Sequence, residues 1–215
     1  MASLFDCAEP DRSKWWTRLD VDTRYYKDGC PIIDRFIGDY RWLSNFHPTD
    51  VPPKSTEHYY QAAKARNDEE GKNWKNVILA VPTPGEAKKL GGKVPLRKDW
   101  EDIKVTVMQF ALAKKFLGSY ELYQKLIDTK DAYLIEGTTW HDCTWGICIK
   151  KDCERCKDKK GKNILGKLLM ELREILIDDV KNKSSGKAEE IIVLFSSLDL
   201  VAAEEERFFN TFTGE

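Results

Sequence analysis

The segment STEHYYQAAKA, residues 55–65, holds residue types that could do chemistry at helical spacing. On a helix, Glu57, Gln61 and Lys64 lie at i, i+4 and i+7. At about 100° per residue they project within roughly 60° of one another. A carboxylate, an amide and an amine on one face could form a reactive site. The alternative is a solvated face whose charges have ordinary salt-bridge spacing.

A second candidate is the turn-rich segment EGTTWHDCTWG, residues 136–146. It carries the carboxylates of Glu136 and Asp142, the imidazole of His141 and the indole of Trp145. These groups on one loop suit a pocket that holds a nucleotide and does acid–base chemistry. The alternative is a loop whose tryptophans fill the core.

The cysteines form a third candidate, although only Cys153-x-x-Cys156 has the spacing of metal ligands. A zinc site could use Cys148, Cys153 and Cys156, with Cys143 or His141 as a further ligand. The alternative is a surface loop with free thiols. Any zinc would be structural, and no catalytic metal is expected.

The cysteines lie in a basic stretch, KKDCERCKDKKGK, residues 150–162. It has seven basic and three acidic residues, a local excess of four positive charges. The stretch is either a solvated loop or a patch that contacts phosphates, as a nucleic-acid substrate would require.

The composition limits the class of protein. The chain has 215 residues, of which 33% are charged and 41% apolar, and its net charge is −1. This is a globular composition without a global attraction to nucleic acid or membrane. No apolar run approaches the roughly 18 residues of a membrane span, and the first residues do not resemble a secretory signal. We therefore expect a monomer with reduced thiols in the cytoplasm or nucleus.

Changes in composition along the chain predict its organisation. Residues 1–30 are polar and form an N-terminal arm, and residues 31–180 form the main domain. A linker covers 181–190, and a C-terminal segment, 191–215, returns to apolar character.

Capping residues and apolar spacing predict mostly helices. One helix begins at Ser55 or Thr56 and runs through Arg66. The others are a short helix capped by Thr83 that stops at Gly91-Gly92, a longer one capped by Asp99 that ends at Gly118, one opened by Ser119, and one over 163–176. The best strand candidates are 32–37 and 132–136, and 191–195 could be strand or helix. The predicted fold is mainly α with a small β element (α+β), as a single compact helical domain.

Six segments in order resemble the NADAR family, which is similar to the riboflavin biosynthesis intermediates N-glycosidase. They are WLSNF (42–46), STEHYYQAAKA (55–65), TPGEAKKLG (83–91), DW followed by VMQFALAKKF (99–100, 107–116), LIEGTTWHDCTWG (134–146) and GKNILGKLLMELR (161–173). The resemblance implies hydrolysis of an N-glycosidic bond to ribose without a cofactor. It also implies a site formed by the EHYYQAAK helix and the D-x-x-WG loop. A cysteine-containing basic insert between Trp145 and Gly161 departs from the family pattern.

The resemblance also implies roles for the matched residues. Glu57 and Asp142 are expected nearest the reacting carbon, with Glu136 orienting the ribose hydroxyls. Lys64 is expected either to hold phosphate as a cation or to attack the sugar as an amine. The residues expected to bind ligand are Asn45, Gln61, Trp100, Lys115, Trp145, Asn163 and Gly166.

Three functions remain open at this point. The first is removal of ADP-ribose from guanine in nucleic acid, in particular DNA, and the basic insert favours it. The second is an N-glycosidase of riboflavin biosynthesis intermediates, the ribosylamino-pyrimidine phosphates. The third, from another class, is a non-catalytic ADP-ribose-binding module. The partner is therefore ADP-ribose or an ADP-ribosylated nucleic acid in the first and third cases.

Overall fold

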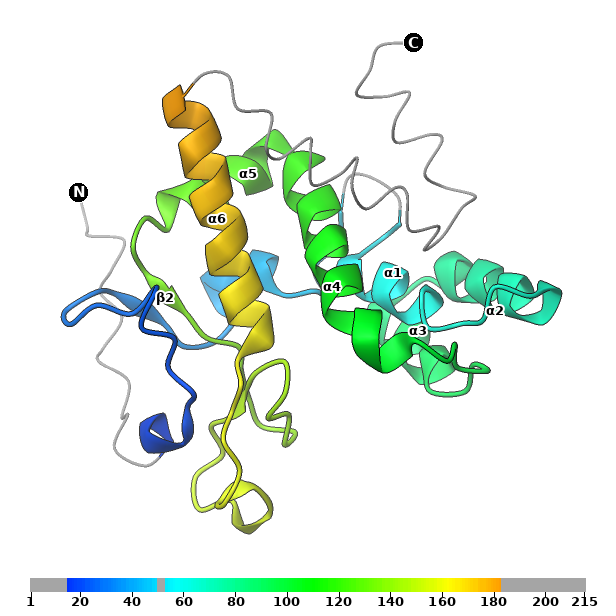
Figure 1. Ribbon diagram of the computed structural model, residues 1–215, viewed down its shortest axis with the longest axis horizontal. Coiled ribbons are helices and arrows are strands. Elements are labelled where there is room, and N and C mark those ends of the chain that lie inside the picture. Colours follow the sequence, from blue (N-terminus) through cyan, green and yellow to red (C-terminus); the bar gives the residue numbers. More distant parts are fainter. Residues whose placement is uncertain (1–14, 50–52, 183–215) are drawn as a thin grey trace. The chain divides into compact units, whose positions relative to one another are not determined.

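The computed structural model describes residues 15–49 and 53–182 (Figure 1). Helices dominate these residues, and the strands form small two-stranded sheets, so the predicted mainly α fold class is confirmed. The contacts group the chain into two compact units. Of the described residues, 15–44 and 128–174 belong to unit 1, and 45–49, 53–127 and 175–182 belong to unit 2.

Unit 2 is built around a short, fully buried helix, α1, Thr56–Ala62, which packs against α2, α3 and α4 (Figure 1). These neighbours and the helix that follows are α2, Glu69–Ala80; α3, Pro84–Gly91; α4, Trp100–Leu117; and α5, Tyr120–Asp128. Ala62, Ile78 and Ala87 form a core where α1, α2 and α3 meet. Small alanine side chains allow the helices to approach closely.

The helix starts follow local capping chemistry. The Ser55 hydroxyl accepts a hydrogen bond from the His58 backbone N–H at 3.3 Å and caps α1. Thr83 and Glu86 form the predicted capping box of α3. The helix after Asp99 starts where expected, but capping by the Asp99 side chain is wrong. That carboxylate instead binds the Arg97 guanidinium, with Nε and Oδ1 2.7 Å apart.

The first helix is shorter than predicted, because it ends at Ala62 rather than at Arg66. The chain turns at Ala63 and Lys64, and Ala65 then pairs with Leu96 in an antiparallel bridge. The backbone N–H of Arg97 donates to the Lys64 carbonyl at 2.9 Å. Tertiary pairing has overridden the local helical pattern here.

Unit 1 contains two small parallel sheets. In the first, β1, Ile32–Ile33, pairs with β2, Tyr133–Leu134, which confirms both predicted strand regions at reduced length. In the second, β3, Gly137–Thr138, pairs with β4, Ile147–Cys148, and neither strand was predicted. Unit 1 also contains three short 3₁₀ helices: η1, Trp16–Arg18; η2, Gly38–Leu43; and η3, Glu154–Cys156.

The described part of the N-terminal arm belongs to unit 1. Leu19 is buried and forms a parallel bridge with Gly161. The backbone N–H of Asp20 donates to the Gly161 carbonyl at 2.8 Å, and the Gly161 N–H donates to the Arg18 carbonyl at 2.8 Å. Residues 15–30 are therefore part of the folded structure, whereas 1–14 lie outside the described residues.

The last described helix, α6, spans Ile164–Asn182 and is longer than predicted. Residues 181 and 182, the first two of the predicted linker, are the last two residues of this helix. The rest of the linker and the predicted C-terminal segment, 191–215, lie outside the described residues.

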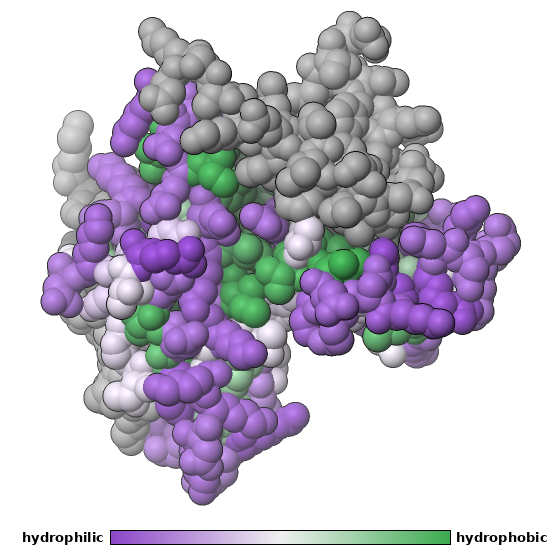
Figure 2. Space-filling view, in the orientation of Figure 1, coloured by the Kyte–Doolittle hydropathy of each residue, from purple (hydrophilic) through white to green (hydrophobic). Residues whose placement is uncertain are grey.

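Hydrophilic side chains gather over the loop that carries η3, at the bottom of the view in Figure 2. This loop belongs to the basic stretch of the sequence, and Lys150, Lys151 and Lys157 are exposed in it. Within residues 15–49 and 53–182, none of the helices combines the length and apolar character needed to cross a bilayer.

Candidate functional site

The carboxylate of Glu57 is the centre of a polar cluster in unit 2. The residue is only 2% exposed and lies in the first turn of α1. One carboxylate oxygen accepts a hydrogen bond from Gln61 Nε2 at 2.7 Å, and the other accepts one from Asn45 Nδ2. Because both oxygens accept hydrogen bonds from neighbouring amides, the buried carboxyl group is held in one orientation.

The backbone reinforces this arrangement. The Glu57 N–H donates to the Asn45 carbonyl at 2.9 Å, so Asn45 contacts Glu57 through both its main chain and its side chain. Gln61 reaches Glu57 from one helical turn away, at i+4. Glu57 and Gln61 therefore share a helix face as their spacing predicts, and Asn45 joins them, while the roles of all three in binding and catalysis stay predictions.

Gly91 allows Gln61 to adopt this position. A Cβ atom on Gly91 would lie 2.0 Å from Gln61 Oε1 and 2.8 Å from Gln61 Cβ, so any larger residue would displace the glutamine. Gln61 Oε1 is buried and accepts no hydrogen bond from the described residues. It offers an acceptor beside the carboxylate. Gly91 is a site-supporting residue that the sequence indicated only as a helix end.

Lys64 lies just beyond α1, beside two aromatic rings. Its Nζ is 5.3 Å from the ring centroid of Tyr60 and 5.8 Å from that of Trp100. The two rings pack edge to face with their centroids 5.0 Å apart. Burial lowers the pKa of the Lys64 ammonium, Glu57 opposes that shift, and Lys88 adds to it. Burial thus favours a reactive amine at Lys64, whereas the faces of the two rings attract its ammonium form. Tyr60 is a neighbour that we had not predicted.

Lys115 occupies a separate, buried position on α4. Together with Lys114, Ser55, Thr56 and Tyr59 it lines a small cavity of about 10 Å³, large enough for about one water molecule. Burial lowers the pKa of Lys115 from 10.5 to about 7. The predicted role of Lys115 in ligand binding stays a prediction.

We expect replacement of Lys115 by methionine to stabilise the protein most near pH 7. Between about pH 7 and 10.5, the unfolded chain binds a proton at Lys115 that the folded chain does not, so the free energy of unfolding rises with pH. Below about pH 7 both states are protonated and this dependence levels off. The difference in Tm between Lys115→Met and wild type, measured by calorimetry, should therefore shrink as pH rises. Lys125→Met, at an exposed position, is the control. A pH-independent difference would contradict the expectation.

In unit 1, Asp142 shapes its own loop. Its Oδ1 accepts hydrogen bonds from the backbone N–H groups of Thr144 at 2.8 Å and Trp145 at 2.9 Å. This is the pattern of an Asx turn, which orients the Trp145 side chain. The loop is also tied to the second small sheet, because the Thr138 hydroxyl donates to the Asp142 carbonyl at 3.4 Å.

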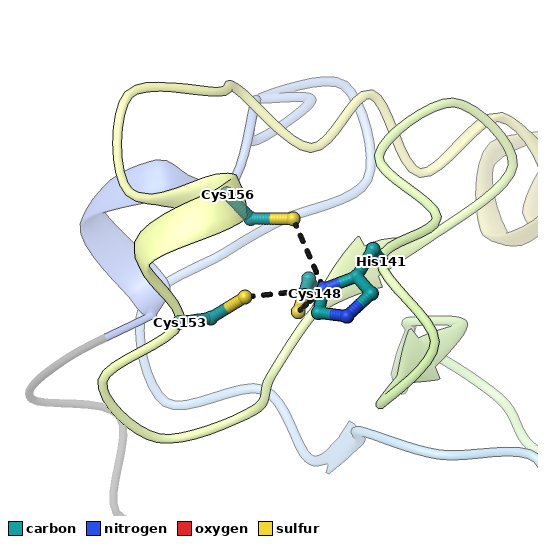
Figure 3. Close-up of side chains that lie close together, drawn as sticks. All are labelled: His141, Cys148, Cys153 and Cys156. Carbon is teal, nitrogen blue, oxygen red and sulfur yellow. Dashed lines mark hydrogen bonds between the residues drawn. The ribbon is translucent and has the colours of Figure 1, made fainter.

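The residue before Asp142 belongs to a cluster of four metal-ligand types, shown in Figure 3. The His141 Nδ1 and the sulfur atoms of Cys148, Cys153 and Cys156 all lie within 4.8 Å of one another. The fourth member is His141 rather than Cys143, which packs against the cluster from outside. The sequence had left both choices open.

Asn163 and Gly166 connect the start of α6 to the strands of unit 1. Asn163 is fully buried with φ of 49°, its Nδ2 donates to the Leu134 carbonyl at 2.9 Å, and its Oδ1 accepts from the Glu136 N–H at 3.0 Å. A Cβ on Gly166 would lie 2.2 Å from the Leu134 carbonyl oxygen. These contacts position the buried Glu136, and binding of ligand by Asn163 and Gly166 stays a prediction.

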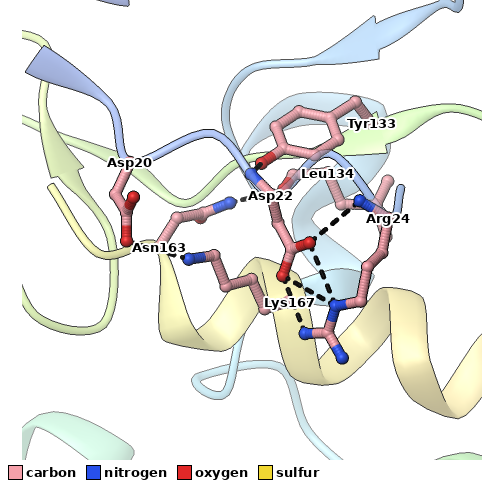
Figure 4. Close-up of polar contacts among 7 residues, drawn as sticks. All are labelled: Asp20, Asp22, Arg24, Tyr133, Leu134, Asn163 and Lys167. Carbon is pink, nitrogen blue, oxygen red and sulfur yellow. Dashed lines mark hydrogen bonds and ion pairs between the residues drawn. The ribbon is translucent and has the colours of Figure 1, made fainter. Parts of the chain in front are cut away.

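Figure 4 shows how the N-terminal segment joins this region. The Tyr133 hydroxyl accepts a hydrogen bond from the Asp22 backbone N–H at 2.9 Å. Lys167 on α6 forms an ion pair with Asp20, with Nζ and Oδ2 3.2 Å apart. Residues far apart in sequence thus meet around the strand that precedes Glu136.

The sequence pattern of the NADAR domain matches residues 35–177, about two thirds of the chain. The chain belongs to the NADAR domain family. All eleven predicted catalytic and ligand-binding positions lie within the matched range. The family assignment therefore agrees with the resemblance inferred from the motifs.

Characterised relatives of this NADAR domain include two bacterial N-glycosidases. N-glycosidase YbiA of Escherichia coli (strain K12) is 39% identical over 145 residues, which are 64% of this chain and 82% of the relative. N-glycosidase Npun_R5314 of Nostoc punctiforme is 36% identical over 142 residues, covering 63% of this chain and 85% of the relative. A longer protein, Riboflavin biosynthesis protein VVA0006 of Vibrio vulnificus, is 32% identical and only 36% of it is covered.

The solution structure of E. coli YbiA has a similar fold. It aligns with a TM-score of 0.59 at 35% sequence identity, covering 78% of this chain and 96% of the YbiA chain. At this identity the likeness concerns the family as well as the fold.

Proposed function

We propose that this NADAR domain is an N-glycosidase that removes ADP-ribose from guanine bases in nucleic acid, in particular DNA. The observation that carries the reaction class is the buried Glu57 carboxylate, fixed by Asn45 and Gln61 in a chain related to two N-glycosidases. A purely binding module would have no need to bury and orient a carboxylate in this way.

The chemistry needs such a group. Breaking the bond between ribose C1 and a base nitrogen leaves positive charge on the sugar, and the base must gain a proton. A preorganised carboxylate in a site largely removed from water stabilises that charge without reorganisation. We assign this role to Glu57, and we propose that Asp142 acts as the second carboxylate of the reaction. Glu136, buried and held by Asn163, orients the ribose hydroxyls.

The aromatic and cationic side chains complete the proposed site. Trp100 and Trp145 provide flat surfaces that can stack on adenine or on the leaving base. Lys64 stands against the Trp100 ring, where burial lowers its pKa. We propose that its amine attacks ribose C1. Hydrolysis requires only water as co-reactant, and no cofactor enters the proposal.

The choice of a nucleic-acid substrate rests on unit 1. A pocket of about 610 Å³ lies beside the basic loop, and its charged lining residues are Arg18, Lys150, Lys151 and Lys157 together with Asp152 and Glu154. Its volume falls in the range of small-ligand sites, and the excess of cations in its lining suits the phosphates of a nucleic acid. The free ribosylamino-pyrimidine phosphates of the alternative function would leave this extended basic surface unused.

The second candidate, cleavage of riboflavin biosynthesis intermediates, is favoured by a different observation. Relatives of this NADAR domain include proteins named for riboflavin biosynthesis, in Vibrio vulnificus and in maize. The chain spans 36% and 24% of those proteins, so the shared region is one part of each. A third possibility, ADP-ribose binding without turnover, makes no use of the fixed Glu57.

The test is incubation with a single-stranded oligonucleotide that carries ADP-ribosylated guanine. Release of ADP-ribose and unmodified guanine, followed by gel and mass spectrometry, is the expected result.

A double variant, Lys150→Gln with Lys151→Gln, should raise KM and weaken the salt dependence of KM while leaving kcat close to wild type. Turnover of a ribosylamino-pyrimidine phosphate alone would favour the second candidate, and ADP-ribose binding without turnover of either substrate would favour the third.

A further inference from the structure

We propose that His141, Cys148, Cys153 and Cys156 bind one zinc ion that holds the loop of Asp142 in place. The donors would be the imidazole Nδ1 and three thiolates (Figure 3). Four protein ligands fill a tetrahedron, so this is a structural zinc site and takes no part in bond cleavage.

The distances fit a single ion among the four donors. With zinc–sulfur bonds of about 2.3 Å and zinc–nitrogen bonds of about 2.0–2.1 Å, neighbouring donors of a tetrahedral site lie roughly 3.5–3.8 Å apart. The His141 Nδ1 lies 3.1 Å from Cys153 Sγ, 3.7 Å from Cys156 Sγ and 4.0 Å from Cys148 Sγ. Small shifts of these side chains would bring all three nitrogen–sulfur distances to the spacing expected around a zinc ion.

Hydrogen bonding alone does not explain this convergence. An imidazole nitrogen carries either one proton or one lone pair, so it makes one good hydrogen bond, whereas three sulfur atoms surround the His141 Nδ1. The three cysteines are buried, with exposed fractions of 0%, 8% and 0%. Buried polar groups need partners, and a shared cation supplies one to every member at once.

The backbone is arranged to present these ligands. The turn of η3 brings Cys153 and Cys156 together, with the Cys156 N–H donating to the Cys153 carbonyl at 3.0 Å. Cys148 comes from β4, paired with β3. His141 has φ of 71°, a left-handed conformation that a residue other than glycine adopts only where its surroundings determine it.

Arg18 supports the site from the N-terminal segment. Its guanidinium donates to the carbonyl of Cys156 at 3.0 Å and to the carbonyl of Cys148 at 2.9 Å. One side chain thus fixes two of the ligand-bearing segments from outside, as supporting hydrogen bonds commonly do around metal ligands. Because His141 directly precedes Asp142, an ion bound here would also restrain the turn that carries Asp142 and Trp145.

The test measures metal in the full chain after expression with added zinc. We expect about one zinc per chain by elemental mass spectrometry in the wild type. Cys153→Ser and His141→Ala should lose it. Cys143→Ser and Cys30→Ser remove thiols outside the four ligands and should keep it. Equal loss in Cys143→Ser and Cys153→Ser, or wild-type protein without zinc, would overturn the assignment.

A measurement on the wild type alone guards against variants that do not fold. After chelation, titration with Co²⁺ should give thiolate-to-metal charge-transfer and tetrahedral d–d absorption bands that saturate at one equivalent. Absence of these bands would sink the proposal. The functional importance of holding the Asp142 loop rests on the proposed function. Both experiments measure metal binding alone, so a protein that binds one zinc per chain but lacks activity would refute only the proposed glycosidase activity.

Discussion

Replacing Glu57 by glutamine should reduce kcat/KM for N-glycosyl cleavage roughly 10³-fold, within the range for a lost acid–base or electrostatic group. The amide keeps the size of the side chain but not the negative charge that opposes the developing sugar cation. It also replaces one of the two accepting oxygens by an N–H₂ group, which then faces the donating amide of Asn45 or of Gln61. Initial rates over a range of substrate concentrations measure the effect.

The control for this prediction is Glu70→Gln, which makes the same chemical change at an exposed residue of α2. The Glu70 side chain forms an ion pair with Arg66, which precedes this helix. Circular dichroism and Tm should show both variants folded. Because Glu57 acts on the transition state, the loss should fall mainly on kcat, with binding of ADP-ribose within a few-fold of wild type. A Glu57→Gln variant with near-normal kcat would remove Glu57 from the mechanism.

The second large effect concerns Lys64. If its amine attacks ribose C1, the bond to the base breaks, the base nitrogen takes the electron pair and a proton, and ring opening leaves an iminium between Nζ and the sugar. Water then releases the sugar and restores the amine. Borohydride adds hydride to the iminium, so we expect a stable adduct on Lys64, located by mass spectrometry of proteolytic fragments.

Lys64→Arg distinguishes the two roles of this residue. Arginine retains a positive charge for phosphate but cannot form an iminium, so activity should fall on the order of 10²-fold or more and no adduct should form. Lys89→Arg on the exposed face of α3 is the control. Near-normal turnover by Lys64→Arg, or an adduct that persists in it, would show that Lys64 acts only as a cation.

The sequence predicted the fold where local chemistry decides it. The capping box at Thr83 and the glycine after α4 mark helix ends through contacts between near neighbours, and the structure has both. The prediction from sequence failed where contacts between residues distant in the chain determine the local structure. The pairing of Ala65 with Leu96 ends α1 early. Helix α2 buries only Gly71, Lys75 and Ile78, too sparse a pattern for a prediction from apolar periodicity.

In the candidate site, too, contacts set by local spacing were predictable from the sequence, whereas contacts between distant residues were not. The contact of Gln61 with Glu57 follows from helical spacing, because i and i+4 share a face. The contribution of Asn45, twelve residues earlier, came only from the family resemblance, and that of Tyr60 was missed. The choice of His141 over Cys143 depends on a left-handed turn and two-residue parallel strands, which leave no periodic signal in a sequence.

The discontinuity of unit 1 has a consequence for synthesis on the ribosome. Residues 45–127 of unit 2 form one continuous stretch whose helices can pair as they emerge. The hydrogen bonds of Arg18 and Asp20 with Gly161 join residues more than a hundred positions apart. The N-terminal segment of unit 1 therefore cannot form these bonds until Gly161 has been synthesised. Residues 15–44 should therefore remain open to proteases and chaperones on nascent chains until Gly161 has left the exit tunnel.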